Sequence, residues 1–224
     1  GQTGNKVVKD RQDWLPITLA IWQKSTDQIR YVNAKMRGSE LRLAEEGADN
    51  SDDLDIKVLF ANGLNSQIAV NDSQDQIVIA LRYPILKAIN TKKTLFSLED
   101  AVYVPYSSAI HTAGLVDVGE RYLDDLVRGV FDRLRAEQVH SRAYPDRLLA
   151  DVIDPSLIKA IAAIEHLDQT SLQQDPDRAI ERFFVTLGGN QGVSYNYSRS
   201  SADALGLVQF IPSTYNRLAA RPEW

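Results

Sequence analysis

The chain has 224 residues, 44% of them hydrophobic, and its 25 basic and 30 acidic side chains give a net charge of -5 at pH 7. This size and hydrophobic content predict a globular protein with one large domain or two small ones. The charge balance lacks the basic excess of nucleic-acid-binding proteins and so argues against a nucleic-acid partner. Because the chain has no cysteine and only three scattered histidines, we expect no disulfide framework, no thiolate or zinc site, and no cofactor.

The sequence also bears on membrane insertion and export. No apolar run reaches the roughly 18 residues of a membrane span. The first residues, GQTGNKVVKDRQDW, lack the apolar core of a signal peptide. We therefore expect no membrane span in this chain, and if the protein is exported, we expect its signal or anchor to lie outside this sequence.

The first segment, from Trp14 to Glu46, carries apolar residues at roughly helical intervals and ends in strong helix formers before Gly47. We predict one long helix or two shorter helices here. The acidic stretch ADNSDDLD at 48–55 then predicts a solvated loop. A calcium site is the weaker interpretation of this stretch, since its aspartates lack the ligand order and the glycine of an EF-hand.

Short β-like runs follow at 56–60, 66–70 and 75–81, separated by turn residues, and they predict a small antiparallel meander. Residues 101–106 are predicted to add an edge strand, because Pro105 cannot donate a ladder hydrogen bond. No catalytic pattern occurs in this half of the chain. Its aromatic side chains could line a binding surface, although strand tyrosines more often pack half-buried; they are Tyr83, Tyr103 and Tyr106.

A regular apolar stripe between Val118 and Gln138 predicts an amphipathic helix that packs one domain onto another. Its members are Tyr122, Leu123, Leu126, Val127, Val130, Phe131 and Leu134. The pattern breaks at Tyr144 and Pro145, so we predict a domain boundary within 143–150. The domains are then an accessory domain over 1–145 and a second domain over 146–224.

The segment DPSLIKAIAAIEH, from Asp154 to His166, contains the main candidate for a chemical role. Asp154 is suited to cap a helix and Pro155 to begin it. Glu165 follows at helical spacing from an aliphatic row that should face the interior, formed by Leu157, Ile158, Ile161 and Ala162. We expect this carboxyl to be partly desolvated, which raises a pKa and lets a glutamic acid donate a proton near neutral pH. The alternative is a helix-end glutamate that reaches solvent or pairs with Arg178 or Arg182.

A second helix is predicted from the same start signal, Asp175 followed by Pro176, and should end at Gly188 and Gly189. The stretch QGVSYNYSRSS at 191–201 is polar and aromatic, with glycine and serine. This composition suits a loop that lines a groove for a polar ligand such as a sugar, with Tyr195 as a candidate contact, but ordinary long loops share it.

The segment SSADALGLVQFIPST at 200–214 resembles the Ser-x-x-Gly-Ala-x-Gly-Leu-Met-Gln-x-Met-Pro-x-Thr signature of the lytic transglycosylases, the bacterial murein-cleaving relatives of goose-type lysozyme. Val208 stands for the usual methionine and Asp203 for the usual glycine. Upstream, the helix that includes Glu165 resembles the family helix with its catalytic glutamate, except that His166 replaces the usual serine. The signature residues in register are Ser200, Ala204, Gly206, Leu207, Gln209, Pro212 and Thr214.

The resemblance implies that Glu165 cleaves the β-1,4 bond between N-acetylmuramic acid and N-acetylglucosamine in peptidoglycan, in the periplasm or cell envelope, and forms a 1,6-anhydro ring. It implies a substrate groove that includes Gln209 as a hydrogen-bond partner and Gly206 as a point of close backbone approach, although Gly206 could instead serve helix packing. The other expected groove residues are Leu207, Val208, Ser200, His166 and Tyr195.

Two alternatives stay open at this stage. A lysozyme-type hydrolase would need a second carboxylate, for which Asp203 and Asp168 are candidates. A non-catalytic wall-binding or assembly module would keep the fold without the reaction. Residues 1–145 are expected to position or regulate the enzyme or to dock it on envelope proteins.

The expected fold class is α+β. It combines N-terminal helices and a small antiparallel meander with a mostly α, lysozyme-like domain, and we expect that domain to be incomplete at its C-terminus, because the chain stops at Trp224.

Overall fold

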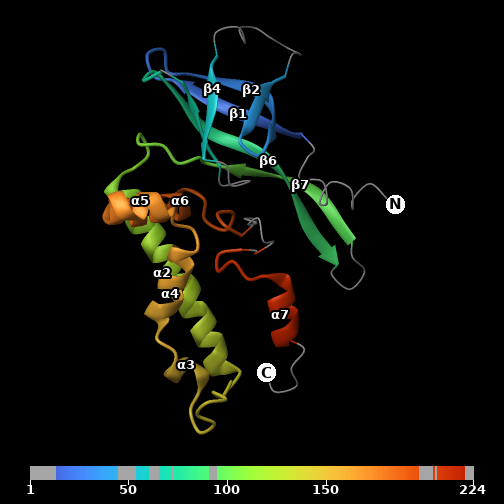
Figure 1. Ribbon diagram of the computed structural model, residues 1–224, viewed down its shortest axis with the longest axis vertical. Helices are drawn as coiled ribbons and strands as arrows, with labels where there is room; N and C mark the ends of the chain where they lie inside the picture. Colours follow the sequence, from blue (N-terminus) through green and yellow to red (C-terminus); the bar gives the residue numbers. More distant parts are fainter. Residues whose placement is uncertain are drawn as a thin grey trace. The chain divides into compact units, whose positions relative to one another are not determined.

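The structure, a computed structural model, describes residues 14–44, 54–60, 66–71, 73–90, 95–196, 204 and 206–219 (Figure 1). It divides into two compact units: Gly1–Ala109 with Gly192–Arg199, and Ile110–Gln191 with Ser200–Trp224. The first is built of β-strands and the second of α-helices, which confirms the α+β class. The acidic loop predicted at 48–55 lies outside the described residues except for Leu54 and Asp55.

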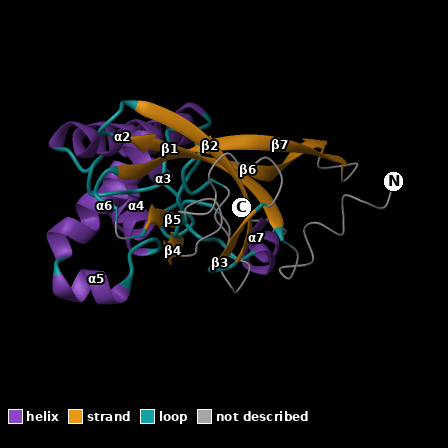
Figure 2. Cartoon of the chain, turned by 90° about the horizontal axis from the view of Figure 1, so that it is seen from above, coloured by secondary structure: helices purple, strands orange, loops and turns teal. Residues whose placement is uncertain are grey.

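The β unit holds two antiparallel sheets (Figure 2). The larger has the strand order β3-β2-β1-β6-β7, and the smaller pairs β4 with β5. The strands are β1 (Leu15–Gln23), β2 (Gln28–Arg37), β3 (Glu40–Leu43), β4 (Ile56–Phe60), β5 (Gln67–Val70), β6 (Gln76–Asn90) and β7 (Leu95–Tyr103).

The helices predicted over 14–46 are wrong, because this segment forms β1, β2 and β3. Apolar residues at every second position of β1 decide the outcome: Ile17, Leu19 and Ile21 are all buried in the sheet core. A period of two places these side chains on one face of a strand, whereas a helix would scatter them around its axis. Burial of that face outweighs the helix propensity of the later residues.

The strands predicted over 56–81 are confirmed, but they do not form one meander. β4 and β5 make a separate ribbon, while β6 runs on to Asn90 and pairs with β1 and β7. β7 is an edge strand, as predicted, and the buried Pro105 lies just beyond its end. Tyr103 is only 1% exposed and Tyr83 packs against the same core, so both serve packing. Burial raises the pKa of each phenol.

The helical unit contains α2 (Ala113–Ala136), α3 (Leu149–Val152), α4 (Pro155–Ile164), α5 (Gln169–Gln174), α6 (Pro176–Gly189) and α7 (Pro212–Ala219). The three helices predicted within 118–189 are confirmed. Their start signals act as expected, since the carboxylate of Asp175 accepts a hydrogen bond from the backbone N–H of Arg178 at 3.1 Å. Among the described residues, no helix combines the length and the apolar character that a membrane span requires.

The boundary predicted within 143–150 lies instead at residues 109 and 110, because α2 packs on α6 and belongs to the helical unit. This packing depends on glycine. A Cβ atom on Gly119 of α2 would overlap the backbone of Phe184, and one on Gly188 of α6 would overlap the carbonyl of Leu115. The two glycines therefore let the helix backbones approach each other closely.

Candidate functional site

The helix that ends at the candidate acid starts as predicted. The carboxylate of Asp154 accepts a hydrogen bond from the backbone N–H of Ser156 at 2.8 Å, and Pro155 is the first residue of α4. The helix ends at Ile164, and Glu165 is its C-cap, with its N–H donating to the carbonyl of Ile161 at 3.1 Å. Glu165 thus stands at the very end of the helix.

The predicted orientation of this helix is wrong, and so is the predicted desolvation of Glu165. Leu157 is 56% exposed and Ile161 40% exposed, whereas the small Ala162 is 1% exposed. Glu165 is also exposed and has no ion-pair partner among the described residues, so the alternative of a solvent-facing glutamate holds. Ala162 is the one fully buried residue of α4, so a small side chain stands where this helix is packed most closely.

His166 links this helix end to the signature segment. Its Nε2 lies 2.8 Å from the carbonyl oxygen of Leu207, and its ring stacks on Phe183 of α6 with centroids 6.3 Å apart and an angle of 12° between planes. Burial lowers the pKa of His166 to about 4, although hydrogen bonds to the carbonyls of Leu207 and Gly206 act against this shift. A carbonyl only accepts, so the neutral ring carries its proton on Nε2.

The signature segment forms a tight turn over 206–209. Gly206 has φ +76° and Gln209 has φ +47°, and both the backbone N–H and the side-chain amide of Gln209 donate to the carbonyl of Gly206, at 3.2 and 2.7 Å. A Cβ on Gly206 would meet no atom within 4 Å, so helix packing does not explain this glycine. Its left-handed backbone does, because other residues adopt that conformation at a cost.

The structure brings together six of the expected site residues and separates one. Glu165 and His166 lie at the end of α4, and the hydrogen bond from His166 places the turn of Gly206, Leu207, Val208 and Gln209 beside it. Ser200 lies outside the described residues. Tyr195 belongs to the β unit and is only 5% exposed, so its expected role as a groove contact is wrong.

Tyr195 is buried because the segment that contains it packs on the β unit. The neighbouring Val193 lies against the core of the large sheet, and Ser194 is buried as well. Polar loop composition did not indicate this packing. The charge of an ionised Tyr195 would raise the pKa of Tyr103, which is a sign that the two phenols are close.

The two candidates for a second carboxylate have different outcomes. Asp168 caps α5, where it accepts hydrogen bonds from the backbone N–H of Ser171 at 2.7 Å and from the Ser171 hydroxyl at 2.8 Å. These bonds lower the pKa of Asp168 and commit its carboxylate to the cap. Asp203 lies outside the described residues.

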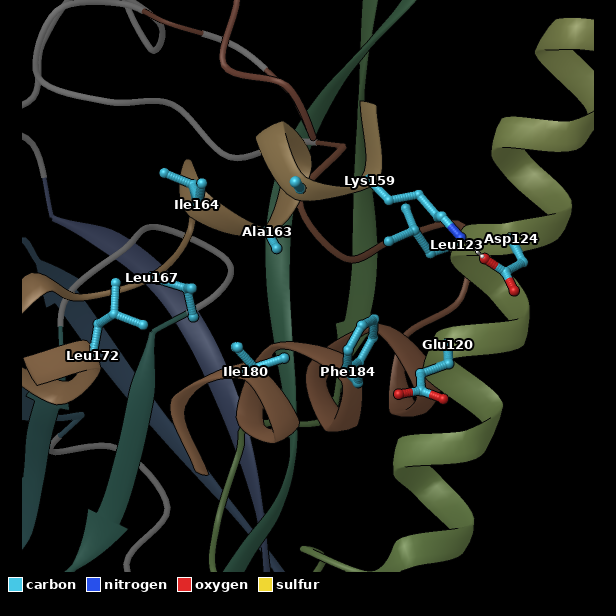
Figure 3. A pocket seen from close by; sticks show the side chains of 11 residues that line it. Glu120, Leu123, Asp124, Lys159, Ala163, Ile164, Leu167, Leu172, Ile180 and Phe184 are labelled. Atoms are coloured by element: carbon cyan, nitrogen blue, oxygen red, sulfur yellow. Dashed lines mark hydrogen bonds and ion pairs between the residues drawn. The ribbon is translucent and has the colours of Figure 1, made fainter. Parts of the chain in front are cut away.

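Sequence reasoning missed two features of this unit. The first is the stacking of His166 on Phe183, which the histidine in place of serine could have suggested. The second is an apolar pocket between the helices, lined from the α4 side by residues such as Ala163 and Ile164 (Figure 3). Within the described ranges, no three His, Asp or Glu side chains gather closely enough to hold a metal ion.

Comparisons of the chain with protein-family models, with curated proteins and with solved structures gave no match.

Proposed function

We propose that the helical unit is a peptidoglycan lytic transglycosylase domain of the cell envelope, with Glu165 as its general acid and base. The supporting observation is the 2.8 Å hydrogen bond between His166 and the carbonyl of Leu207. It joins the two segments that resemble the family, the end of the glutamate helix and the Gly-Leu-Val-Gln turn, although they lie 41 positions apart in sequence. This junction brings the turn at 206–209 to the end of α4, where Glu165 precedes His166.

The proposed reaction needs only one carboxyl group. Protonated Glu165 donates its proton to the glycosidic oxygen, and the bond from that oxygen to C1 of N-acetylmuramic acid breaks. The acetamido group of the same sugar stabilises the positive charge on C1. The Glu165 carboxylate then removes the proton of the C6 hydroxyl, whose oxygen bonds to C1 and closes the 1,6-anhydro ring, so the carboxyl group returns to its protonated form.

The exposure of Glu165 adds a condition to this mechanism. Because Glu165 is exposed, the bound glycan itself has to displace the water around its carboxyl group before the proton transfer. The surface beside it suits such a ligand, because Leu157, Ile161 and Ile164 form an exposed apolar stripe along the same side of α4. Ile164 is 63% exposed. Sugar rings that cover this stripe would also cover Glu165.

The same exposure favours a second candidate, a non-catalytic module that binds peptidoglycan. In that case Glu165 would contribute a hydrogen-bond acceptor to the bound glycan and would transfer no proton. The two candidates differ in a measurable way, because a binding module sediments with sacculi but releases no soluble fragments from them.

The test is the substitution Glu165→Gln, which removes the transferable proton with little change in shape. The substitution Glu137→Gln is the matched control, since Glu137 is an exposed helix-capping residue at the end of α2. Soluble muropeptides released from purified sacculi are measured for the wild type and both variants, together with the fraction of protein that sediments. We expect release to fall at least about 100-fold in Glu165→Gln and to stay unchanged in Glu137→Gln. Unchanged release by Glu165→Gln would remove this residue from the mechanism, and binding without release by the wild type would favour the second candidate.

A further inference from the structure

The helical unit contains an apolar pocket of about 640 Å³. Its long walls come from α4 and α6, while residues of α2 line one end and Leu167 and Leu172 line the other (Figure 3). The walls are almost entirely aliphatic and aromatic, formed chiefly by Ala160, Ala163, Ile164, Ile180 and Phe184. Volumes of roughly 300–1,000 Å³ with mostly apolar walls are typical of small-molecule sites.

The charged groups of the pocket lie together at its α2 end. Lys159 of α4 donates to the carboxylate of Asp124 at 2.8 Å, so these two charges compensate each other. Glu120 is one helical turn before Asp124 and has no ion-pair partner among the described residues. The pocket therefore carries one uncompensated negative charge at one end and none at the other (Figure 3).

The pocket and Glu165 lie on different sides of α4, and Ile164 borders both the pocket and the exposed stripe proposed to meet the glycan. The pocket is lined by residues 159, 160, 163, 164 and 167. With 3.6 residues per helical turn, these positions centre on the side of α4 opposite Glu165. His166 points toward Phe183 and Leu207, and neither of these lines the pocket. A ligand in the pocket would not touch the carboxyl assigned to the reaction.

We propose that this pocket binds a small amphiphile that has an apolar body and a cationic head. The apolar body lies between α4 and α6, where it buries itself against Ala163 and Phe184, and the head lies beside the carboxylates of Glu120 and Asp124. The charged groups gather at one end of the pocket while the rest of its lining is apolar, which suits a ligand with one polar head and an apolar body. An anionic head is disfavoured, because it would meet the uncompensated charge of Glu120.

The test uses decylammonium as the probe, with decanoate as its anionic match, both below the concentration at which they form micelles. Binding to the whole chain is measured by calorimetry at low salt. We expect decylammonium to bind about tenfold more tightly than decanoate, and Glu120→Gln to reduce this preference about threefold, since one exposed charge contributes up to about 1 kcal/mol. The control Glu137→Gln should leave both affinities unchanged. Equal affinities for the two probes would overturn the proposal.

A second variant tests the location. Ala163→Phe fills the space between α4 and α6 and should weaken decylammonium binding at least about tenfold, provided that circular dichroism shows the helices intact. A spin-labelled decylammonium gives a readout that needs no variant: it should broaden the nuclear magnetic resonance signals of Ile180 and Phe184. Broadening confined to other residues, or full affinity in folded Ala163→Phe, would show that the amphiphile binds outside this pocket and would overturn the proposal.

Discussion

The low pKa of His166 predicts that the free energy of unfolding depends on pH. In the folded chain the pKa of His166 is about 4, whereas an unfolded histidine has a pKa of about 6.5. Between these values the unfolded chain binds a proton that the folded chain does not, so the free energy of unfolding rises with pH. The contribution is complete above about pH 6.5 and is lost as the pH falls toward 4.

The size of the effect follows from the difference between the two pKa values. A difference of about 2.5 units at 1.36 kcal/mol per unit gives at most about 3 kcal/mol between pH 7 and pH 4, and less because the ring is only partly buried. The substitution His166→Gln removes the titration, while its amide can still donate to the carbonyl of Leu207. The variant should therefore lose most of this pH dependence.

The assay is urea unfolding followed by far-ultraviolet circular dichroism, which reports mainly on the helical unit, at several pH values from 7 to 4. Trp14 and Trp22 lie in the β unit and Trp224 belongs to the helical unit, so tryptophan fluorescence would mix signals from the two parts of the chain. His140→Gln keeps the contact of His166 and serves as the control. Its free energy of unfolding should change with pH as steeply as that of the wild type. If the free energy of unfolding changed with pH as steeply in His166→Gln as in the wild type, His166 would not be the source of the pH dependence. A proton resonance of His166 that titrates near pH 6.5 would likewise contradict its lowered pKa.

Two further predictions concern glycines. Gly119→Ala should lower the free energy of unfolding of the helical unit by about 1–3 kcal/mol or more, because the new methyl group overlaps α6. Gly129→Ala in the same helix has open space around the new methyl group and should raise the free energy of unfolding by about 0.5–1 kcal/mol. Equal effects of the two substitutions in urea unfolding would contradict the close helix contact. Gly206→Ala should cost about 1–2 kcal/mol through its left-handed backbone and reduce muropeptide release, while Gly206→Asn, which tolerates that backbone better, should keep more of both. Equal loss of stability and release in the two Gly206 variants would argue against a conformational role.

The helical half of the fold could be read from the sequence because its signals are local. Asp154 and Asp175, each followed by proline, mark helix starts that depend only on neighbouring residues. The first strands could not be read in the same way. The apolar residues of β1 alternate, but the segment 14–46 as a whole also offers helical intervals and helix formers, and pairing of β1 with β6, distant in sequence, favours the strands.

In the candidate site, too, some features follow from local sequence and others depend on contacts between distant segments. The motifs single out Glu165 and Gly206, but which side of α4 faces the interior depends on the neighbouring helices. Ala162, rather than the larger Ile161, fits that contact. Tyr195 illustrates a further limit, because its segment is joined to the β unit while the residues before and after it belong to the helical unit.

The central claim is that Glu165 both donates and removes a proton at one sugar, without water as a reactant. Mass spectrometry of the fragments that the chain releases from purified sacculi tests this most directly, because the fragment ends record how C1 was closed. We expect 1,6-anhydro-N-acetylmuramic acid ends that disappear in Glu165→Gln. Reducing N-acetylmuramic acid ends would contradict it and would indicate a hydrolase that activates water.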